Sequence, residues 1–161
     1  RERGRLKFTA ESVDFFTEEG TARLEARHNG TVMHDILSRV VVPSDLPSSV
    51  RKAVLDGEVE PSQEEELVKF LASRIASHPE WFPADGEGIF NEVSLIDTDG
   101  REWRPDRVIV RDGSVTVVDY KFGERDPRYA RQVGRYASIY RRMGWNDVRT
   151  AISYVNSDLV E

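Results

Sequence analysis

The 161-residue sequence contains no cysteine. This absence excludes disulfide bonds, thiol nucleophiles, zinc sites built on cysteine and cysteine-ligated iron–sulfur clusters. The sequence also lacks any apolar run close to the roughly 20 residues that cross a bilayer, so we expect no membrane-spanning helix. Internal repeats are absent too, and hydrophobic residues make up 39% of the chain, enough for a buried core. The length therefore predicts a single domain over residues 1–161.

Charge is distributed unevenly along the chain. Lys and Arg number 23 against 29 Asp and Glu, a net charge of −6, which argues against a nonspecific nucleic-acid binder. Between Lys121 and Arg142, however, seven basic residues face two acidic ones, which gives a local charge of +5. The rest of the chain must then carry −11.

The first half of the sequence predicts helices. Residues 31–41 repeat apolar side chains at steps of three and four, so one face of a helix is apolar and also carries His34. A second long helix is expected from Ser62, because Ser62 and Glu65 have the spacing of a capping box. Two shorter helices are expected at residues 9–19 and 50–55.

The second half predicts a sheet. Short segments rich in Val, Ile and aromatic residues indicate strands at residues 90–96, 102–110 and 115–120. Residues 97–100 and 111–114 are hairpin turn signals between them. A helix follows over 126–143, capped by Asp126, and then a strand at 149–155. This order predicts an α/β fold with a mixed central sheet, an antiparallel meander plus a further strand, flanked by helices.

Two carboxylates are expected to meet on this sheet. Alternation along the third strand puts Asp119 and Lys121 on one face. If the hairpin pairs the strands, Asp106 comes near Asp119 at the end away from the turn. Neighbouring carboxylates repel each other, and a divalent cation is the usual remedy, with Mg²⁺ and Mn²⁺ preferring acidic oxygen ligands. The pattern therefore predicts a metal site.

The helix over residues 126–143 has two distinct faces. Its apolar face, expected to pack on the sheet, carries Tyr129, Val133, Tyr136 and Tyr140. A basic face carries Arg128, Arg131, Arg135 and Arg142, and such a face could hold phosphates.

Several short motifs occur in a recognisable order. Pro105-Asp106, twelve intervening residues and Asp119-Tyr120-Lys121 spell PD-(D/E)XK. The accompanying segments are Gly30-Thr31-Val32-Met33-His34 with Leu37, Asn91-Glu92-Val93, and Gln132 with Tyr136. Together, over about residues 30–155, they resemble the RecB and AddA nuclease domain, which is C-terminal in UvrD/Rep-type helicases and belongs to the PD-(D/E)XK nuclease superfamily. Arg104-Pro105 departs from the family, in which many members have glycine, and this leaves the local strand path open.

The resemblance implies a restriction-endonuclease-like core and a role for each motif. The implied metal ligands are His34, Asp106, Asp119 and the backbone carbonyl of Tyr120. Lys121 would orient or activate the attacking water, so the implied catalytic residues are Asp106, Asp119 and Lys121. Supporting side chains would be Glu92, Gln132 and Tyr136, and DNA-binding ones Arg128, Arg131 and Arg135. The implied cofactor is Mg²⁺, with Mn²⁺ as a substitute and without an iron–sulfur cluster; one or two ions are compatible.

The resemblance also implies a biological setting. It predicts an exonuclease V-like, metal-dependent deoxyribonuclease that acts in DNA end resection and recombinational repair. The chain starts at Arg1 and has no phosphate-binding GxxxxGK[ST] motif, so we expect a C-terminal fragment of a longer helicase–nuclease, with residues 1–29 as a helical lead-in. The expected partners are DNA, the helicase domains of the parent chain and, as an option, a second subunit. A bacterial cytoplasmic location without membrane contact is expected.

Structural interpretations compete with each of these roles. A lone histidine on an apolar helix is more often a hydrogen-bonded core residue than a ligand. Asp106 with Arg107, and Asp119 with Lys121, could be ordinary ion pairs, and an arginine stripe is a solvated face in most proteins. Glu92, expected on a half-buried strand, could instead pair with an arginine. The alternative for the whole chain is an inactive nuclease-like domain that binds DNA or a partner subunit.

Overall fold

The computed structural model describes the backbone of residues 20–161 and the side chains of residues 28–161. The helix expected at residues 9–19 lies outside this range. The chain divides into two compact units, a helical unit at residues 1–84 and a sheet unit at residues 85–161. The single nuclease domain expected over residues 1–161 stays a prediction. No helix in the described part of the chain is long and apolar enough to cross a bilayer.

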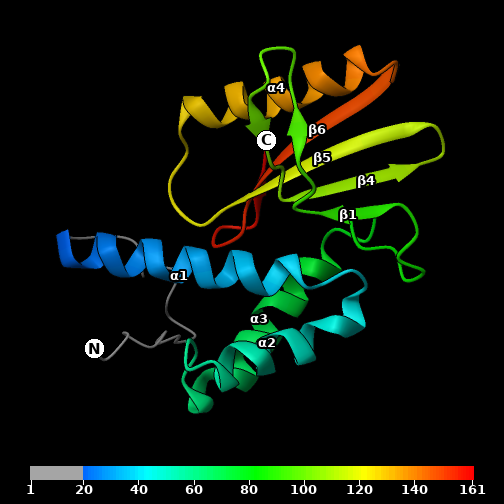
Figure 1. Ribbon diagram of the computed structural model, residues 1–161. Coiled ribbons are helices and arrows are strands. Elements are labelled where there is room, and N and C mark those ends of the chain that lie inside the picture. Colours follow the sequence, from blue (N-terminus) through cyan, green and yellow to red (C-terminus); the bar gives the residue numbers. More distant parts are fainter. Residues whose placement is uncertain (1–19) are drawn as a thin grey trace. The chain divides into compact units, whose positions relative to one another are not determined.

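The described part of the helical unit, from residue 20 on, contains three α-helices (Figure 1), which are α1 (Gly20–Ser38), α2 (Leu46–Leu55) and α3 (Glu64–Ala76). Single 3₁₀ turns at Pro43–Asp45 and Pro61–Gln63 precede α2 and α3. Apolar side chains at helical spacing form the core of the unit, and the most buried are Val32, Ile36, Val50, Leu67 and Leu71. The helices thus form because each has one face to bury.

Some predicted helix boundaries were wrong. The helix that carries His34 begins before Gly30 and ends at Ser38, because burial of its apolar face outweighs the weak helix propensity of one glycine. The expected capping box at Ser62 does not form: a 3₁₀ turn occupies that position, and Gln63 precedes α3 without a side-chain cap. The acidic side chains in the first turn of α3 instead stabilise the helix by interacting with the positive end of its dipole.

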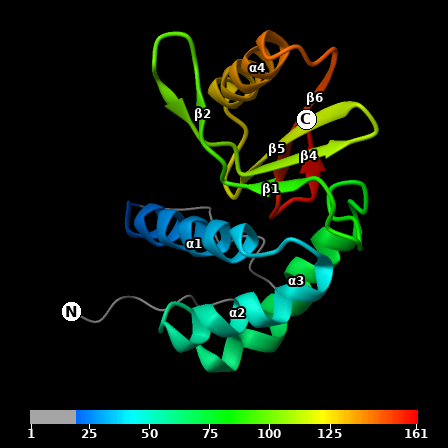
Figure 2. The ribbon, with the colours of Figure 1, turned by 45° about the vertical axis from the view of Figure 1, so that its right-hand side comes forward.

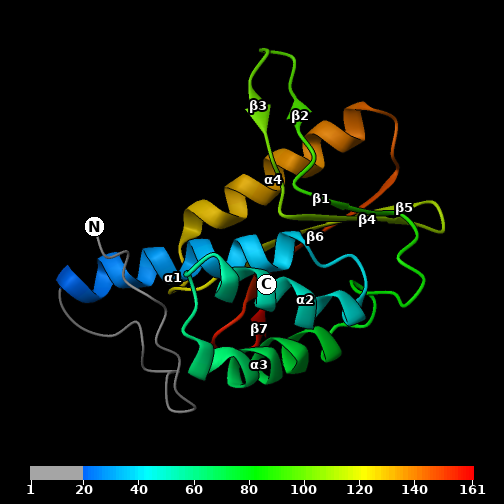
Figure 3. The same cartoon turned by 60° about the horizontal axis from the view of Figure 1, so that its bottom comes forward.

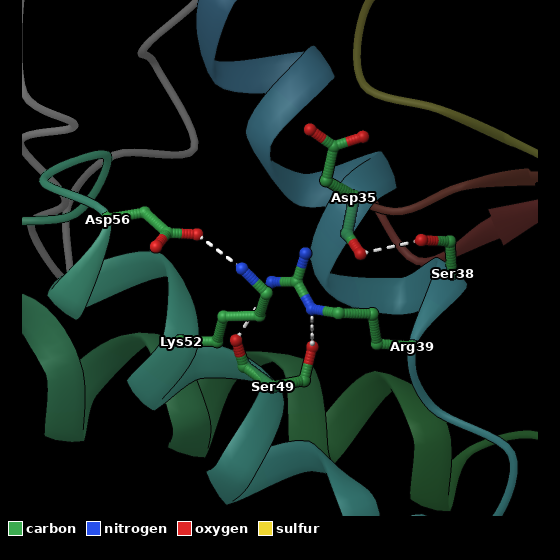
Figure 4. A network of polar contacts seen from close by, with 6 residues as sticks. All are labelled: Asp35, Ser38, Arg39, Ser49, Lys52 and Asp56. Atoms are coloured by element: carbon green, nitrogen blue, oxygen red, sulfur yellow. Dashed lines mark hydrogen bonds and ion pairs between the residues drawn. The ribbon is translucent and has the colours of Figure 1, made fainter.

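A polar contact joins α1 to α2 (Figure 4). The Arg39 guanidinium donates to the Oγ and carbonyl oxygen of Ser49, at 3.1 and 2.9 Å. Ser49 Oγ in turn donates to the Ile36 carbonyl near the end of α1, at 2.6 Å. Ser49 is buried, so these bonds satisfy polar groups that would otherwise be costly to remove from water.

The sheet unit has five strands in the order β1-β4-β5-β6-β7. Their bounds are β1 (Ile89–Asn91), β4 (Arg107–Arg111), β5 (Ser114–Lys121), β6 (Asp147–Tyr154) and β7 (Leu159–Val160). All neighbours are antiparallel except β5 and β6, which the crossover helix α4 (Pro127–Arg142) connects in parallel. Figure 1 shows α4 lying across one face of this sheet. The predicted α/β class with a mixed sheet and helices is confirmed.

Two predicted strands are each split. The strand expected at 90–96 becomes β1 and β2 (Leu95–Ile96), and that at 102–110 becomes β3 (Glu102–Trp103) and β4. β2 and β3 pair only with each other, and we call residues 94–104 the hairpin arm (Figures 2 and 3). The breaks fall at Glu92, which has a positive φ of 54°, and at Pro105, which cannot donate a ladder hydrogen bond. The short strand β7 was not predicted.

The core of the sheet unit lies between β4, β5, β6 and α4. It contains Val108, Val115, Val117, Ile152 from the strands and Val133, Tyr136, Ile139, Tyr140 from the helix. Leu95 of the hairpin arm joins the same core, which holds the arm against α4. The apolar face predicted for α4 therefore packs on the sheet as expected.

Candidate active site

The β4–β5 hairpin brings the two predicted carboxylates together. Its turn uses Asp112 and Gly113, both with positive φ (51° and 77°), a geometry that matches the twist of paired strands. Pairing runs from the turn to Arg107 opposite Val118, and Asp106 and Asp119 follow one step further. The Asp106 N–H donates to Asp119 Oδ1 at 3.0 Å. The two side chains are therefore neighbours across adjacent strands.

The ladder between β4 and β5 ends at these residues. Continued register would place Pro105 opposite Tyr120, and proline has no N–H to donate. The Tyr120 N–H donates instead to the side-chain Oδ2 of Asp106, at 2.8 Å. The chain before Asp106 thus leaves the sheet, and the end of the ladder is closed by a carboxylate rather than by backbone. This settles the strand path at Arg104-Pro105.

Lys121 lies at the end of β5, on the face that carries Asp119. Its Nζ donates to Gln132 Oε1 of α4 at 3.2 Å and lies 4.4 Å from the centroid of the Tyr129 ring. The helix that supplies both contacts starts as predicted, with Pro127 at its first position and Asp126 Oδ1 accepting the Arg128 N–H at 2.9 Å. This cap fixes the first turn of α4 above the end of β5.

Tyr136 reaches the carboxylates from the middle of α4. The side chain is buried, and burial first, then the negative charges of Asp119 and Asp106, raise the pKa of its phenol, while the Gln132 side chain lowers it. The phenol therefore stays protonated and can donate a hydrogen bond beside the acidic pair. Trp103 of the hairpin arm packs edge-on against its ring, with centroids 6.1 Å apart.

The carboxylate oxygens at this end of the sheet are suitable ligands for a hard divalent cation. Two adjacent carboxylates, one of them Asp119 at 2% exposure, leave little water to screen their repulsion. Carboxylate oxygens are the ligands that Mg²⁺ and Mn²⁺ prefer. In residues 28–161 no group of three or more His, Asp and Glu side chains is gathered closely enough to hold an ion. The candidate site is therefore described by two carboxylates, Asp106 and Asp119.

Comparison with known proteins identifies the family of this chain. The model of the PD-(D/E)XK nuclease superfamily matches residues 2–159, almost the whole chain. The chain belongs to this superfamily. No curated protein matches the sequence. Membership indicates a nuclease that binds DNA, and nucleases of the PD-(D/E)XK superfamily generally use divalent metals such as Mg²⁺.

The third predicted metal ligand of this PD-(D/E)XK chain, His34, lies on α1 in the helical unit. Its Nδ1 is 2.8 Å from the Gly30 carbonyl oxygen, one helical turn earlier. A carbonyl can only accept, so Nδ1 carries the proton, and in the neutral ring the lone pair is then on Nε2. This tautomer is compatible with coordination through Nε2, and the role of His34 as a ligand stays a prediction.

Glu92 lies differently from the expectation. It is exposed at a bend after β1 rather than on a half-buried strand, because its positive φ ends the strand there. Its backbone N–H donates to the Asp106 carbonyl at 3.2 Å, so the bend is tied to the residue that carries the first carboxylate. A supporting role of the Glu92 side chain stays a prediction.

The three arginines proposed for DNA are all exposed on α4 but differ in their contacts. Arg128 is ion-paired with the capping residue Asp126, at 2.6 Å. Arg135 lies over the Trp103 ring of the hairpin arm, 5.4 Å from its centroid. The pKa of Asp97 is lowered mainly by the hydrogen bond from the Trp103 side chain, and the charge of Arg135 makes a smaller contribution in the same direction. Arg131 is therefore the arginine of this set best placed to meet a phosphate, and Arg128 the least.

Sequence reasoning missed two residues of this region. Tyr129 was assigned to the packing face of α4, although its position three residues before Gln132 already places both on one side of the helix. The sequence offered Arg107 only as an alternative ion-pair partner of Asp106. Strand alternation points it to the opposite face, where it is fully buried and donates to Asn91 Oδ1 at 3.1 Å. Only the burial of that face distinguishes this arginine from a surface one.

Proposed function

We propose that this chain is a metal-dependent deoxyribonuclease that hydrolyses phosphodiester bonds. The observation that carries the proposal is that Asp106 and Asp119 meet at the ends of β4 and β5. The Asp106 N–H donates to the Asp119 carboxylate at 3.0 Å, the Tyr120 N–H donates to the Asp106 carboxylate at 2.8 Å, and strand alternation puts Lys121 on the face of Asp119. Like charges close together are costly when one of them is buried, as Asp119 is, and a cation between them would offset that cost.

The chain's residues divide the work as follows. Asp106, Asp119 and the Tyr120 carbonyl would hold Mg²⁺ or Mn²⁺, and His34 of the helical unit stays a predicted further ligand. When bound, such an ion polarises the scissile phosphate and lowers the pKa of water. Lys121 orients the attacking water and offsets the negative charge that grows on the phosphate, as a compact cation can. Gln132 and Tyr136 keep Lys121 and the carboxylates in place, Glu92 supports them from the bend, and Arg131 and Arg135 bind the DNA backbone.

The proposed setting is an exonuclease V-like helicase–nuclease of the RecB or AddA kind. In that setting the domain cuts DNA during end resection and recombinational repair in the bacterial cytoplasm. Its partners are the helicase domains of the parent chain, with a second subunit as an option. The order of the four motifs along the chain supports this placement.

A nuclease assay tests the proposal directly. Wild-type protein is incubated with linear DNA in Mn²⁺, in Mg²⁺ and in EDTA, beside Lys121→Ala and the control Lys69→Ala. Lys69 is an exposed lysine paired with Glu65 on α3. We expect cutting that EDTA abolishes and that Lys121→Ala reduces by roughly 10²- to 10³-fold, as for the loss of one electrostatic stabiliser. The control should cut at the wild-type rate.

Two results would count against parts of the proposal. Metal-dependent cutting that survives Lys121→Ala would refute the role given to Lys121. DNA binding without cutting, in either metal, would favour an inactive nuclease-like domain that binds DNA or a partner subunit.

A further inference from the structure

Tyr129 is a second contact of Lys121 that no motif assigns. We propose that Tyr129 is a positioning residue of the nuclease site, whose ring face holds the Lys121 ammonium at the end of β5, on the sheet face that carries Asp119. The inference rests on the proposed function and adds to it a residue outside the PD-(D/E)XK pattern. It is carried by geometry from three elements, β5, α4 and β6.

The ammonium is held from two directions. Nζ lies 4.4 Å from the Tyr129 ring centroid, inside the roughly 6 Å over which a ring face attracts a cation. Gln132 Oε1 accepts from the same nitrogen at 3.2 Å. A lysine on its flexible four-carbon stem samples many rotamers, and one hydrogen bond leaves it free to swing about that bond. The ring supplies the second point of attachment that removes this freedom.

The Tyr129 ring is itself well placed. The Tyr129 N–H donates to the Asp126 carbonyl at 3.0 Å, in the capped first turn of α4. Across the sheet, Tyr154 of β6 is paired in register with Lys121, and its ring lies 6.4 Å from that of Tyr129. The Tyr154 hydroxyl bonds to Glu161 Oε2 at 3.1 Å. Tyr129 therefore sits over two neighbouring strand positions, one of which is the catalytic lysine.

The contact uses the ring and not the hydroxyl. Attraction of a cation to an aromatic face comes from the ring quadrupole, which phenylalanine also has and leucine lacks. Leucine still fills a half-buried apolar site, so the fold should tolerate both replacements. Tyr129→Phe is then a matched control for Tyr129→Leu, since only the second removes the feature that matters.

The experiment uses the full chain and two readouts. Cleavage of a labelled linear DNA in Mn²⁺ gives kcat and KM for wild type, Tyr129→Phe and Tyr129→Leu. We expect Tyr129→Leu to lower kcat by roughly 3- to 30-fold, the range of a cation–π contact, with KM within about twofold, and Tyr129→Phe to stay near wild type. NMR of the lysine ε-CH₂ groups is the second readout, and the chain has only four lysines to resolve. The ring-current shift of Lys121 should persist in Tyr129→Phe and vanish in Tyr129→Leu.

The outcomes separate this inference from the proposed function. Unchanged kcat in Tyr129→Leu, or an equal loss in Tyr129→Phe, would overturn the positioning role. A rise in KM alone would also overturn it, by making Tyr129 a DNA contact. A wild-type protein that cuts no DNA overturns the proposed function instead, and the NMR comparison then still decides whether the ring holds the ammonium.

Discussion

Arg107 is the largest fully buried side chain of the described residues. It lies on the face of the sheet opposite Asp119, yet it is next in sequence to Asp106. Its guanidinium donates to Asn91 of β1, and the adjacent Tyr120 phenol offsets the desolvation that lowers the pKa of the arginine. Burial disfavours the charged form of Tyr120 as well, and for a phenol this raises the pKa. One cation thus connects the three strands that end at the candidate site.

Replacing this arginine should destabilise the whole sheet unit. Arg107→Ala leaves a cavity and a polar Asn91 without its donor, so we expect a loss of roughly 3 kcal/mol in the free energy of unfolding. Arg111→Ala is the control, since Arg111 is also on β4 but forms an exposed ion pair with Asp85. Exposed ion pairs contribute little, and urea unfolding should show almost no change. Equal losses in the two variants would show that burial of Arg107 has no special weight.

At the scale of elements, the approach of β1 to β4 depends on one glycine. Gly88 has a φ of 71°, and a Cβ there would collide with the Val110 carbonyl oxygen. The Val110 N–H donates to the Gly88 carbonyl at 2.8 Å, so the two backbones cannot separate without losing this bond.

Gly88→Ala and Gly100→Ala should therefore differ strongly. Gly100, at the tip of the hairpin arm, has a similar φ of 77° but open space around it. Its replacement should cost about 1 kcal/mol, from backbone strain alone. The same strain plus overpacking should cost about 3 kcal/mol or more at Gly88. Thermal unfolding of both variants measures the difference, and similar midpoints would contradict the close approach.

The cap of α4 predicts a pH dependence. The side chain of Arg128, and then its backbone N–H, lower the pKa of Asp126 from 3.8 to about 2. A lowered pKa means that the carboxylate stabilises the fold above about pH 4 and loses this effect as the pH falls toward 2. Asp126→Asn keeps a good capping residue but removes the charge. Wild type should melt higher than the variant at pH 6, and the two should converge near pH 2. A difference that stays constant with pH would argue against the charged cap.

For the whole molecule, a net charge of −6 must coexist with DNA binding. The basic face of α4 concentrates the positive charge. Each contact with a phosphate releases counterions from the DNA, so the slope of log affinity against log salt measures the number of phosphate contacts. Replacing both Arg131 and Arg135 by Gln should reduce the slope of log affinity against log salt, on single-stranded DNA, by about 1.4. Arg149→Gln, which removes an arginine paired with Asp147 on β6, should leave the slope unchanged. An unaltered slope in the double variant would remove α4 from the DNA path.

The sequence alone was enough for the features that depend on neighbours in the chain. Alternation placed Asp119 and Lys121 on one face, the Asp112-Gly113 turn set the register that brings Asp106 to Asp119, and Asp126 with Pro127 marked the start of α4. Each depends on the conformations open to a few adjacent residues, which their side chains restrict.

Tertiary structure decided what depends on residues far apart. The two long predicted strands are divided between the sheet and the hairpin arm. Their sheet parts, β1 and β4, are in the five-stranded sheet, whereas β2 and β3 pair with each other and Leu95 packs in the core that includes α4. Arg107, considered from the sequence as an ion-pair partner of Asp106, is buried on the opposite face of the sheet, and the packing of α4 put Tyr129 over Lys121. Such contacts join segments whose separation in the sequence carries no local signal, because their free energy arises only when the two surfaces have come together.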